Sequence, residues 1–426
     1  MDTETQDVAA SCDGEHPARR VGWVVGALAL GGFGIGTTEF VAMGLLPNIA
    51  SSLGVSEPTA GHLISAYALG VVVGAPLIAV LAARVSRRTL LIALMVAFTL
   101  GNALSLVAQN YPTLMAARFV AGLPHGAYFG VASLVAAHLA GPGRRAQAVG
   151  QVMMGLSVAN VLGVPAATWL GQALGWRAAL ALVVVIGAVT VLALWRVVPD
   201  LRSMRTTDPA TELGGLRHGQ IWLTLLVGVV GFGGFFAFYT YLNTALTSLG
   251  GLSEAAVPIA LMLFGAGMVS GNYLGGRLAD RLGDKAIAIG MASAASALVL
   301  FALLVSTGWP AVIMTFFVGC SGSAAIPGLQ TRLMDVAHDA QTIAAALNHS
   351  ALNVANALGA WVGGLVIAHG LGYRAPSLVG AVLAVGGVLV LAAAVAAARR
   401  SGEEMPQREV AVPVGDEPVG DVRSGR

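Results

Sequence analysis

The stretch AVLAARVSRR (79–88) returns later in the chain, with changes, as GRLADRLGDK (276–285). Two further pairs recur in the same order: RFVAG (118–122) with TFFVG (315–319), and VANVLG (158–163) with VANALG (354–359). The offset between copies stays at 196–197 residues, which chance similarity between apolar residues would not maintain. The sequence therefore predicts two like halves. Membrane proteins built in this way bind their substrates between the halves, near the middle of the bilayer.

The composition is that of a membrane protein. The chain is 56% hydrophobic and only 10% charged, and its mean hydropathy is +0.79. A soluble domain would carry about a quarter charged residues. The apolar runs are long enough to cross roughly 30 Å of hydrocarbon as helices. These observations predict an all-α integral membrane protein.

Twelve spans are predicted, six in each half, so the fold class is two pseudo-symmetric six-helix bundles. The spans cover residues 21–46, 59–82, 89–108, 112–139, 147–172, 177–197, 219–247, 255–279, 286–306, 310–334, 341–369 and 374–397.

The predicted domains follow from these spans. They are a disordered head (1–20), an N-terminal bundle (21–197), a linker (198–218), a C-terminal bundle (219–397) and a disordered tail (398–426). Of the 23 Lys and Arg residues, 20 fall on one side of the membrane if both termini are cytoplasmic. This bias is the positive-inside rule. The first apolar run is too long for a signal-peptide core, so we expect a retained span in the cytoplasmic membrane.

Glu39 is the one acidic residue that the predicted spans place well inside the hydrocarbon, and Arg118 in the fourth span is its basic counterpart. An ionisable side chain there costs at least ~2.5–3.5 kcal/mol, so its presence indicates a function. Glu39 lies eight residues before Pro47 and Arg118 six residues after Pro112. These spacings correspond to depths of roughly 12 and 9 Å at the helical rise per residue. A direct or water-mediated ion pair between Glu39 and Arg118 is therefore compatible with their depths.

Three roles for Glu39 follow from this position. Burial favours the neutral carboxyl and a nearby arginine favours the carboxylate, and a balance between them would let Glu39 carry a proton. The alternatives are a permanent structural ion pair with Arg118 and a carboxylate that only contacts substrate. At the repeat offset, Phe236 and Thr315 stand in the second half where Glu39 and Arg118 stand in the first. The repeat thus predicts that protons are handled by the first half.

Histidines and amides add polar groups to other spans. His125 follows Arg118 by seven residues, about 20° further round a helix, so the two share a face. His125 is either a proton relay or a hydrogen-bonded neutral group. His349, Asn353 and Asn356 follow one another at i, i+4 and i+7 in the eleventh span. That stripe either lines a wet cavity or bonds to adjacent helices.

The seventh span is unusually aromatic. Rings in a cavity wall bind apolar, planar or amphipathic compounds, and the alternative is a lipid-facing or interfacial belt. We assign proton coupling to Glu39, Arg118 and His125. The residues predicted to line the substrate cavity are Tyr67, Phe236, Tyr239, Asn243, His349 and Asn353.

Motifs of other chemistries are absent from the sequence. There is no GxxxxGK[ST] loop for a nucleotide, no HExxH or GxSxG, and no Cys/His cluster. We therefore expect neither an enzyme nor a bound cofactor or metal. Nothing in the charge pattern points to nucleic acid.

These residues also resemble a known family. GGRLADRLGDK (275–285) resembles the cytoplasmic loop signature of the major facilitator superfamily, in which two six-helix bundles rock around a central cavity. RFVAG (118–122) resembles its fourth-span signature, whose arginine is implicated in proton coupling. GTTEFVAMGLLPNIASSLG (36–54) and RFVAGLPHGAYFGV (118–131) are similar to the arabinose-efflux-permease (AraJ-like) and chloramphenicol-resistance branch of the proton-coupled drug antiporters. AGHLISAYALGVVVGAP (60–76) and VANVLGVP (158–165) extend this similarity over most of the first half.

The resemblance implies a conformational gate at the loop signatures, formed by Arg84, Arg88, Asp280 and Arg281. In the family, the acidic residue of the signature helps to lock the cytoplasmic side. The first copy departs from the pattern, because Ala83 stands where Asp280 stands in the second. Only the Asp280 side of the lock is therefore expected to be complete. Span 5 reads GVPAATWLG (163–171) in place of the tighter glycine–proline pattern usual in antiporters.

The sequence thus predicts a secondary active transporter that exports a small amphipathic, drug-like compound, such as a chloramphenicol-type antibiotic, in exchange for protons. The main alternative is an exporter of a sugar or nucleoside-like metabolite. An uptake symporter and a non-transporting membrane receptor are further alternatives. The expected partners are the small-molecule substrate, protons and the lipid bilayer, and we expect a monomer.

Overall fold

A computed structural model describes residues 17–55, 57–201, 204, 206–253 and 256–401. The predicted disordered head and tail lie outside these residues, except that residues 17–20 and 398–401 are helical. Within the described part of the chain, twelve helical segments are long and apolar enough to cross a membrane, and there is no strand. The prediction of an all-α membrane protein with twelve spans is confirmed.

The first half holds six spans, and the fifth is built from more than one helix. Its helices are α1 (Pro17–Gly44), α2 (Leu46–Leu53), α3 (Glu57–Leu81), α4 (Arg87–Val107), α5 (Tyr111–Ala140), α6 (Arg145–Val158), η1 (Ala159–Gly163), α7 (Val164–Leu174) and α8 (Trp176–Val197).

The second half repeats this plan after a short linker helix, α9 (Pro209–Gly215). Its helices are α10 (Gly219–Ser248), α11 (Val257–Leu282), α12 (Asp284–Leu304), η3 (Val305–Thr307), α13 (Trp309–Ala324), α14 (Ile326–Val336), α15 (Gln341–Ala368) and α16 (Ala375–Ser401).

The fifth span changes its winding at mid-height. The α-helix α6 passes into a turn of π-helix, η1, and then into α7, whose first turn contains Pro165. Proline has no N–H to continue the helical hydrogen-bond ladder. π-Helical turns are rare in proteins, and those that occur are often found at functional sites. Asn160, on η1, lies at the seam between the halves.

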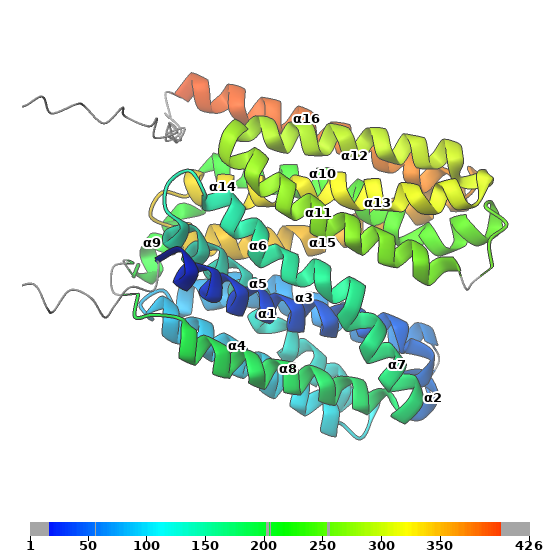
Figure 1. The fold of residues 1–426 in the computed structure, drawn as a ribbon, viewed down its shortest axis with the longest axis horizontal. Coiled ribbons are helices and arrows are strands. Elements are labelled where there is room, and N and C mark those ends of the chain that lie inside the picture. Colours follow the sequence, from blue (N-terminus) through cyan, green and yellow to red (C-terminus); the bar gives the residue numbers. More distant parts are fainter. Residues whose placement is uncertain (1–16, 56, 202–203, 205, 254–255, 402–426) are drawn as a thin grey trace, which may run out of the picture.

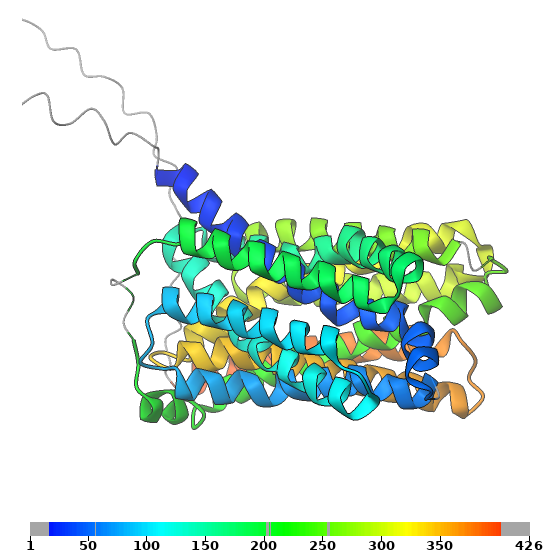
Figure 2. The same cartoon turned by 90° about the horizontal axis from the view of Figure 1, so that it is seen from below.

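The two halves lie side by side, and the described chain begins and ends at one end of the bundle (Figures 1 and 2). We call this the terminal end; it also carries the turns after α3, α5, α11 and α14. The halves meet where α6 packs on α11 and where α15 packs on α3 and α5. The α6–α11 and α15–α3 contacts are equivalent under the repeat, which confirms the pseudo-symmetry.

Gly150 allows α6 and α11 to pack closely at the seam. A Cβ added to Gly150 on α6 would lie 2.4 Å from the carbonyl oxygen of Asn272 on α11. Only a residue without a side chain allows this approach of the two backbones, as is common between membrane helices. On the outside, the exposed side chains include many large apolar ones, such as Leu81, Val107 and Val382. Such a surface is suited to lipid rather than water.

Candidate functional site

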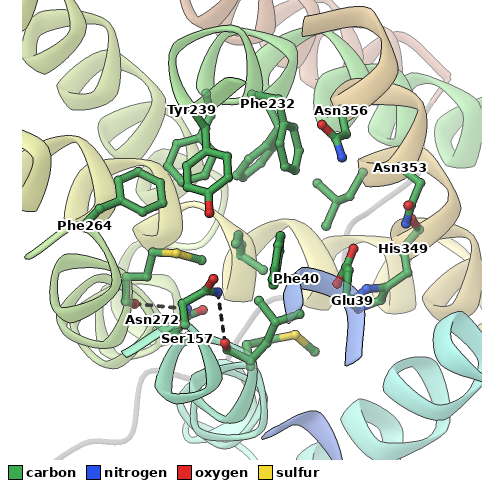
Figure 3. A pocket seen from close by; sticks show the side chains of 18 of the residues that line it. Glu39, Phe40, Ser157, Phe232, Tyr239, Phe264, Asn272, His349, Asn353 and Asn356 are labelled. Atoms are coloured by element: carbon green, nitrogen blue, oxygen red, sulfur yellow. Dashed lines mark hydrogen bonds between the residues drawn. The ribbon is translucent and has the colours of Figure 1, made fainter. Parts of the chain in front are cut away.

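A cavity of about 90 Å³ lies between the two halves (Figure 3). Helices of both halves line it, with α1, α5, α6 and η1 on one side and α10, α11, α14 and α15 on the other. Its aromatic residues are Phe40, Phe232, Phe235, Phe236, Tyr239 and Phe264. Its polar residues are Glu39, His125, Ser157, Asn160, Asn272, His349, Asn353 and Asn356.

Glu39 is the acidic residue of this wall. The side chain is half-buried and comes from the C-terminal part of α1, while Tyr239 enters the same cavity from α10 (Figure 3). The neighbouring ring of Phe40 meets Tyr239 edge-on across the seam, with centroids 6.4 Å apart. Among the described residues, no hydrogen bond or ion pair holds the Glu39 carboxyl group. Its carboxyl group is therefore open to the cavity.

Arg118 does not form the ion pair that the sequence left open. Its Nη1 donates to Thr38 Oγ1 at 3.1 Å, and its Nη2 donates to the Thr38 carbonyl oxygen at 3.2 Å. The guanidinium carbon lies 4.5 Å from the centre of the Tyr67 ring. Arg118 is 3% exposed and lies behind the cavity wall, bonded to Thr38, the residue that precedes Glu39. The charges of Arg118 and Glu39 interact there without a direct contact.

Tyr67 links Arg118 to a pair of histidines. Its hydroxyl lies 3.2 Å from His125 Nδ1, a hydrogen bond whose direction depends on the histidine tautomer. The His125 ring lies 5.4 Å from the ring of His349, which belongs to the other half. His349 stacks on Phe129 at 4.3 Å, and its Nε2 is buried without a partner. His125 and His349 both line the cavity, so this cluster joins the Arg118 site to the seam.

Four of the six residues predicted to line a substrate cavity lie in the wall of this cavity: Phe236, Tyr239, His349 and Asn353. The other two lie elsewhere. Tyr67 is 2% exposed and lies behind the wall, between Arg118 and His125. Asn243 comes about one turn after Tyr239 on α10, is exposed, and falls outside the described lining.

Sequence reasoning missed other parts of the wall. Phe40 and Phe264 were not singled out, although Phe40 directly follows Glu39. Asn160 and Asn356 are equivalent under the repeat, and both line the cavity. Symmetry-related positions close to the axis between two halves necessarily face one another, and this was the available signal.

Among the predicted gate residues, Asp280 is the one seen to join the halves. Its Oδ1 accepts from the Ala146 N–H at 2.8 Å and its Oδ2 from the Gln147 N–H at 2.9 Å, at the first turn of α6. Arg88 instead donates to the Trp195 carbonyl oxygen within the first half, at 2.8 Å. Arg281 is exposed.

Two further contacts at the terminal end concern the gate. The charge of Arg84 interacts with Asp208 of the linker, so this predicted gate residue is associated with the linker. An ion pair that was not predicted, Arg145 Nη1 to Asp335 Oδ1 at 2.8 Å, also crosses the seam. The terminal end is therefore held shut in this structure.

The sequence profile of the Major Facilitator Superfamily matches residues 28–348 and 251–417 of the chain. Together with the twelve-helix fold and the seam cavity, this shows that the chain belongs to the major facilitator superfamily of transporters. Within it, the chain lies in the AraJ-like and chloramphenicol-resistance branch, as its motifs suggested.

Three relatives support the placement of the chain in this branch. Inner membrane transport protein YdhP of Escherichia coli (strain K12) is 42% identical over 84% of this chain and 92% of its own length. Putative transporter AraJ of the same organism is 36% identical over 84% and 92%. The chloramphenicol resistance protein of Streptomyces lividans is 34% identical over 82% and 90%. The protein is thus a multi-pass transporter of the cell membrane.

A solved structure has the same fold. The proton:xylose symporter XylE superimposes with a TM-score of 0.72 over 89% of this chain and 96% of its own, at 16% sequence identity.

Proposed function

We propose that this transporter exports a small amphipathic, drug-like compound in exchange for protons, with Glu39 as the proton carrier. The observation that carries the proposal is the position of Glu39, whose carboxyl group has no bonded partner among the described residues and lines the same cavity as six aromatic side chains. Such a group is the natural proton acceptor of the site.

The orientation of the chain predicts which side of the membrane the closed end faces. Because 20 of the 23 Lys and Arg residues lie on one side, we place the terminal end in the cytoplasm. The contacts of Asp280 and Arg145 then close the cytoplasmic side of the seam. We infer that, with the cytoplasmic side closed, the cavity exchanges protons with the outside, where the proton concentration drives uptake onto Glu39 and where an exported compound is released.

The cavity chemistry favours an amphipathic ligand. Aromatic rings on α10 and α11 offer an apolar face, while Glu39 and the asparagines offer hydrogen-bonding groups on other parts of the wall. At about 90 Å³ the cavity is smaller than the roughly 300–1,000 Å³ of a drug-sized site. We therefore infer that it widens when the terminal end opens and that it is contracted in the state described here.

Coupling between proton and compound follows from the shared cavity. A ligand seated against Phe236 and Tyr239 with a hydrogen-bond donor or a cationic group on Glu39 would stabilise the carboxylate, and protonation of Glu39 would remove that interaction. Arg118, held to Thr38, supplies a fixed positive charge nearby that favours proton release. Proton and compound thereby bind in alternation, which is the requirement for exchange.

The test is transport by the purified protein in liposomes with an imposed proton gradient and a pH-sensitive dye inside. A panel of chloramphenicol-like drugs, sugars and nucleosides is added to wild type, to Glu39→Gln and to Asp339→Asn. Asp339 is an exposed carboxylate at the terminal end and is the matched control. We expect one compound class to move protons with wild type and with Asp339→Asn, and no proton movement with Glu39→Gln.

Binding of the same compound to Glu39→Gln separates loss of coupling from loss of folding. We expect Glu39→Gln to bind the compound with an affinity that no longer varies with pH. Proton movement by Glu39→Gln equal to that of wild type at every pH would remove Glu39 from the coupling role and turn attention to His125.

A second candidate is a sugar or nucleoside-like metabolite, favoured by the cavity amides. Asn353 Nδ2 donates to the His349 carbonyl oxygen and Asn160 Nδ2 to the Leu156 carbonyl oxygen, so their N–H groups are used within their own spans. Asn272 Oδ1 is buried without a partner. The free carbonyl oxygens suit the hydroxyl groups of such a ligand. Proton movement with sugars or nucleosides in the same liposomes, and not with the drugs, would select this candidate.

A further inference from the structure

The first-half loop lacks the carboxylate that the second-half loop uses as a lock. In the second half, Asp280 accepts two backbone N–H groups at the start of α6, including that of Ala146. At the repeat offset of 197, Ala83 corresponds to Asp280 and Ile343, at the start of α15, corresponds to Ala146. The first turn of α15 has unsatisfied N–H groups like any other helix. Ala83 has no side-chain oxygen to offer them.

A different residue supplies the missing oxygen. Glu212 on the linker helix α9 is fully buried, and its Oε2 accepts from the Ile343 N–H at 2.9 Å. Its Oε1 accepts from Thr207 Oγ1 at 2.5 Å. The backbone group that is equivalent to Ala146 N–H is thus capped by a carboxylate after all. The expectation that only the Asp280 side of the lock is complete is therefore wrong for this structure.

The linker is tied to both halves at this point. The Thr207 N–H donates to the carbonyl oxygen of Ala83, at the end of the first-half loop, at 3.2 Å. On the other side, Gly215 comes so close to α15 that an added Cβ would lie 2.2 Å from Ala340 Cβ. Residues 207–215 therefore bridge the first loop and the start of α15 at the terminal end.

Charge and capping hold the bridge in shape. Arg87 at the start of α4 is 4% exposed, and its charge interacts with that of Glu212. Asp208 begins α9 by accepting from the Thr211 N–H at 2.8 Å. That N–H, together with the nearby charge of Arg84, holds the pKa of Asp208 below its usual value of 3.8. The linker helix thus has an anionic cap, as helices generally prefer.

We propose that Glu212 is a positioning residue of the transport cycle, which replaces the missing acid of the first loop and locks α15 to the linker while the terminal end is closed. Opening of this end must draw α15 away from α3 and break the Glu212–Ile343 bond. The linker is then part of the gate rather than a passive connection. This inference rests on the superfamily fold and its two states, and it does not depend on the substrate or on Glu39.

The experiment measures the balance of the two states directly. In a chain with Cys12 and Cys320 replaced by serine, spin labels are placed at Arg196 on α8 and Arg399 on α16. Both positions are exposed, at the terminal end and in different halves. The distance distribution between the labels is recorded for detergent-purified protein by pulsed electron resonance. A longer distance reports an open terminal end.

We expect Glu212→Ala to raise the population of the open state about tenfold, a shift of the size that a lost charged helix cap produces. Glu212→Gln, which keeps an oxygen but no charge, should give a smaller shift in the same direction. The control Asp339→Asn should leave the distribution unchanged. Distributions for both Glu212 variants equal to that of wild type would overturn the proposal.

The decisive variant restores the acid at its symmetric place. Adding Ala83→Asp to Glu212→Ala should return the distribution toward that of wild type, because an aspartate there is placed as Asp280 is toward α6. Ala83→Asp alone, with Glu212 present, should not favour the closed state further, since two carboxylates then compete for one N–H group. Failure of the double variant to recover, in protein that remains monodisperse, would overturn the claim that Glu212 stands in for the loop acid.

Discussion

Replacing Asp280 by asparagine should loosen the seam at α6 and favour the open terminal end. The carboxylate accepts two N–H groups of the other half, from Ala146 and Gln147, at 2.8 and 2.9 Å. Asparagine keeps the shape and one acceptor oxygen, but its nitrogen cannot accept and it carries no charge. The variant therefore removes one of the two bonds and the attraction between a charge and the helix N-terminus.

The size of the effect can be worked from these contacts. A hydrogen bond to a charged group contributes ~1.5–3 kcal/mol, and loss of an N-cap costs ~0.5–2 kcal/mol. Because one acceptor oxygen stays and water can reach the opened site, we take about 1–2 kcal/mol for the whole change. At 1.4 kcal/mol per factor of ten, the ratio of open to closed molecules should rise about 5- to 30-fold.

The assay is the distance measurement between labels at Arg196 and Arg399, with and without the substitution. Asp339→Asn, at an exposed carboxylate of the same end, removes a charge without touching the seam and is the control. An Asp280→Asn distribution that matches this control would refute the reasoning. The two loop contacts would then be consequences of closure and not causes of it.

Two other predictions concern the same end of the molecule. Gly150→Ala should also favour the open state, by about 1–3 kcal/mol of overpacking, since its Cβ would lie 2.4 Å from the Asn272 carbonyl oxygen. The distance between the labels at Arg196 and Arg399 measures this shift. The control is Gly26→Ala, because an added Cβ there would have nothing within 4 Å. The Asp208 cap of α9 has a folded-state pKa below its usual value, so its stabilisation is present above that usual value and is lost as the pH falls through the folded-state pKa. Asp208→Asn should therefore make the linker more sensitive to added protease at neutral pH and should change little in strong acid; equal cleavage of wild type and variant at neutral pH would contradict this.

The fold was predictable because its signals are local or periodic. Span length and hydropathy gave twelve helices, and the repeat gave two like halves with a seam between them. Asp280 was assigned to the gate because its loop resembles the signature of the family. A membrane leaves so few ways to satisfy a backbone that element type and order follow directly from composition.

The parts that could not be predicted depend on rotation and on long-range contact. Depth along a helix placed Glu39 and Arg118 at one level but did not fix which way the arginine turns, and it bonds Thr38. Tyr67 was expected in the cavity wall, but its side chain lies on the face of α3 that is turned toward Arg118. Glu212 lies 131 residues from the N–H group that it accepts, in a linker with no periodic pattern. No local rule connects two such residues.

The asymmetry of the two halves explains how one cavity could serve two ligands. Glu39 and Phe236 occupy equivalent positions under the repeat, and both line the cavity. Arg118, behind Glu39, corresponds to Thr315, a buried residue whose hydroxyl bonds to the Ala260 carbonyl oxygen and stays clear of the cavity. The same site in the fold is thus polar and charged in one half and aromatic in the other. Since symmetric positions face each other across the seam, a carboxyl group and an aromatic ring both contact whatever enters between them. Under the proposed function, a proton and the polar part of the compound would compete for Glu39 beside the ring that binds the apolar part of the compound.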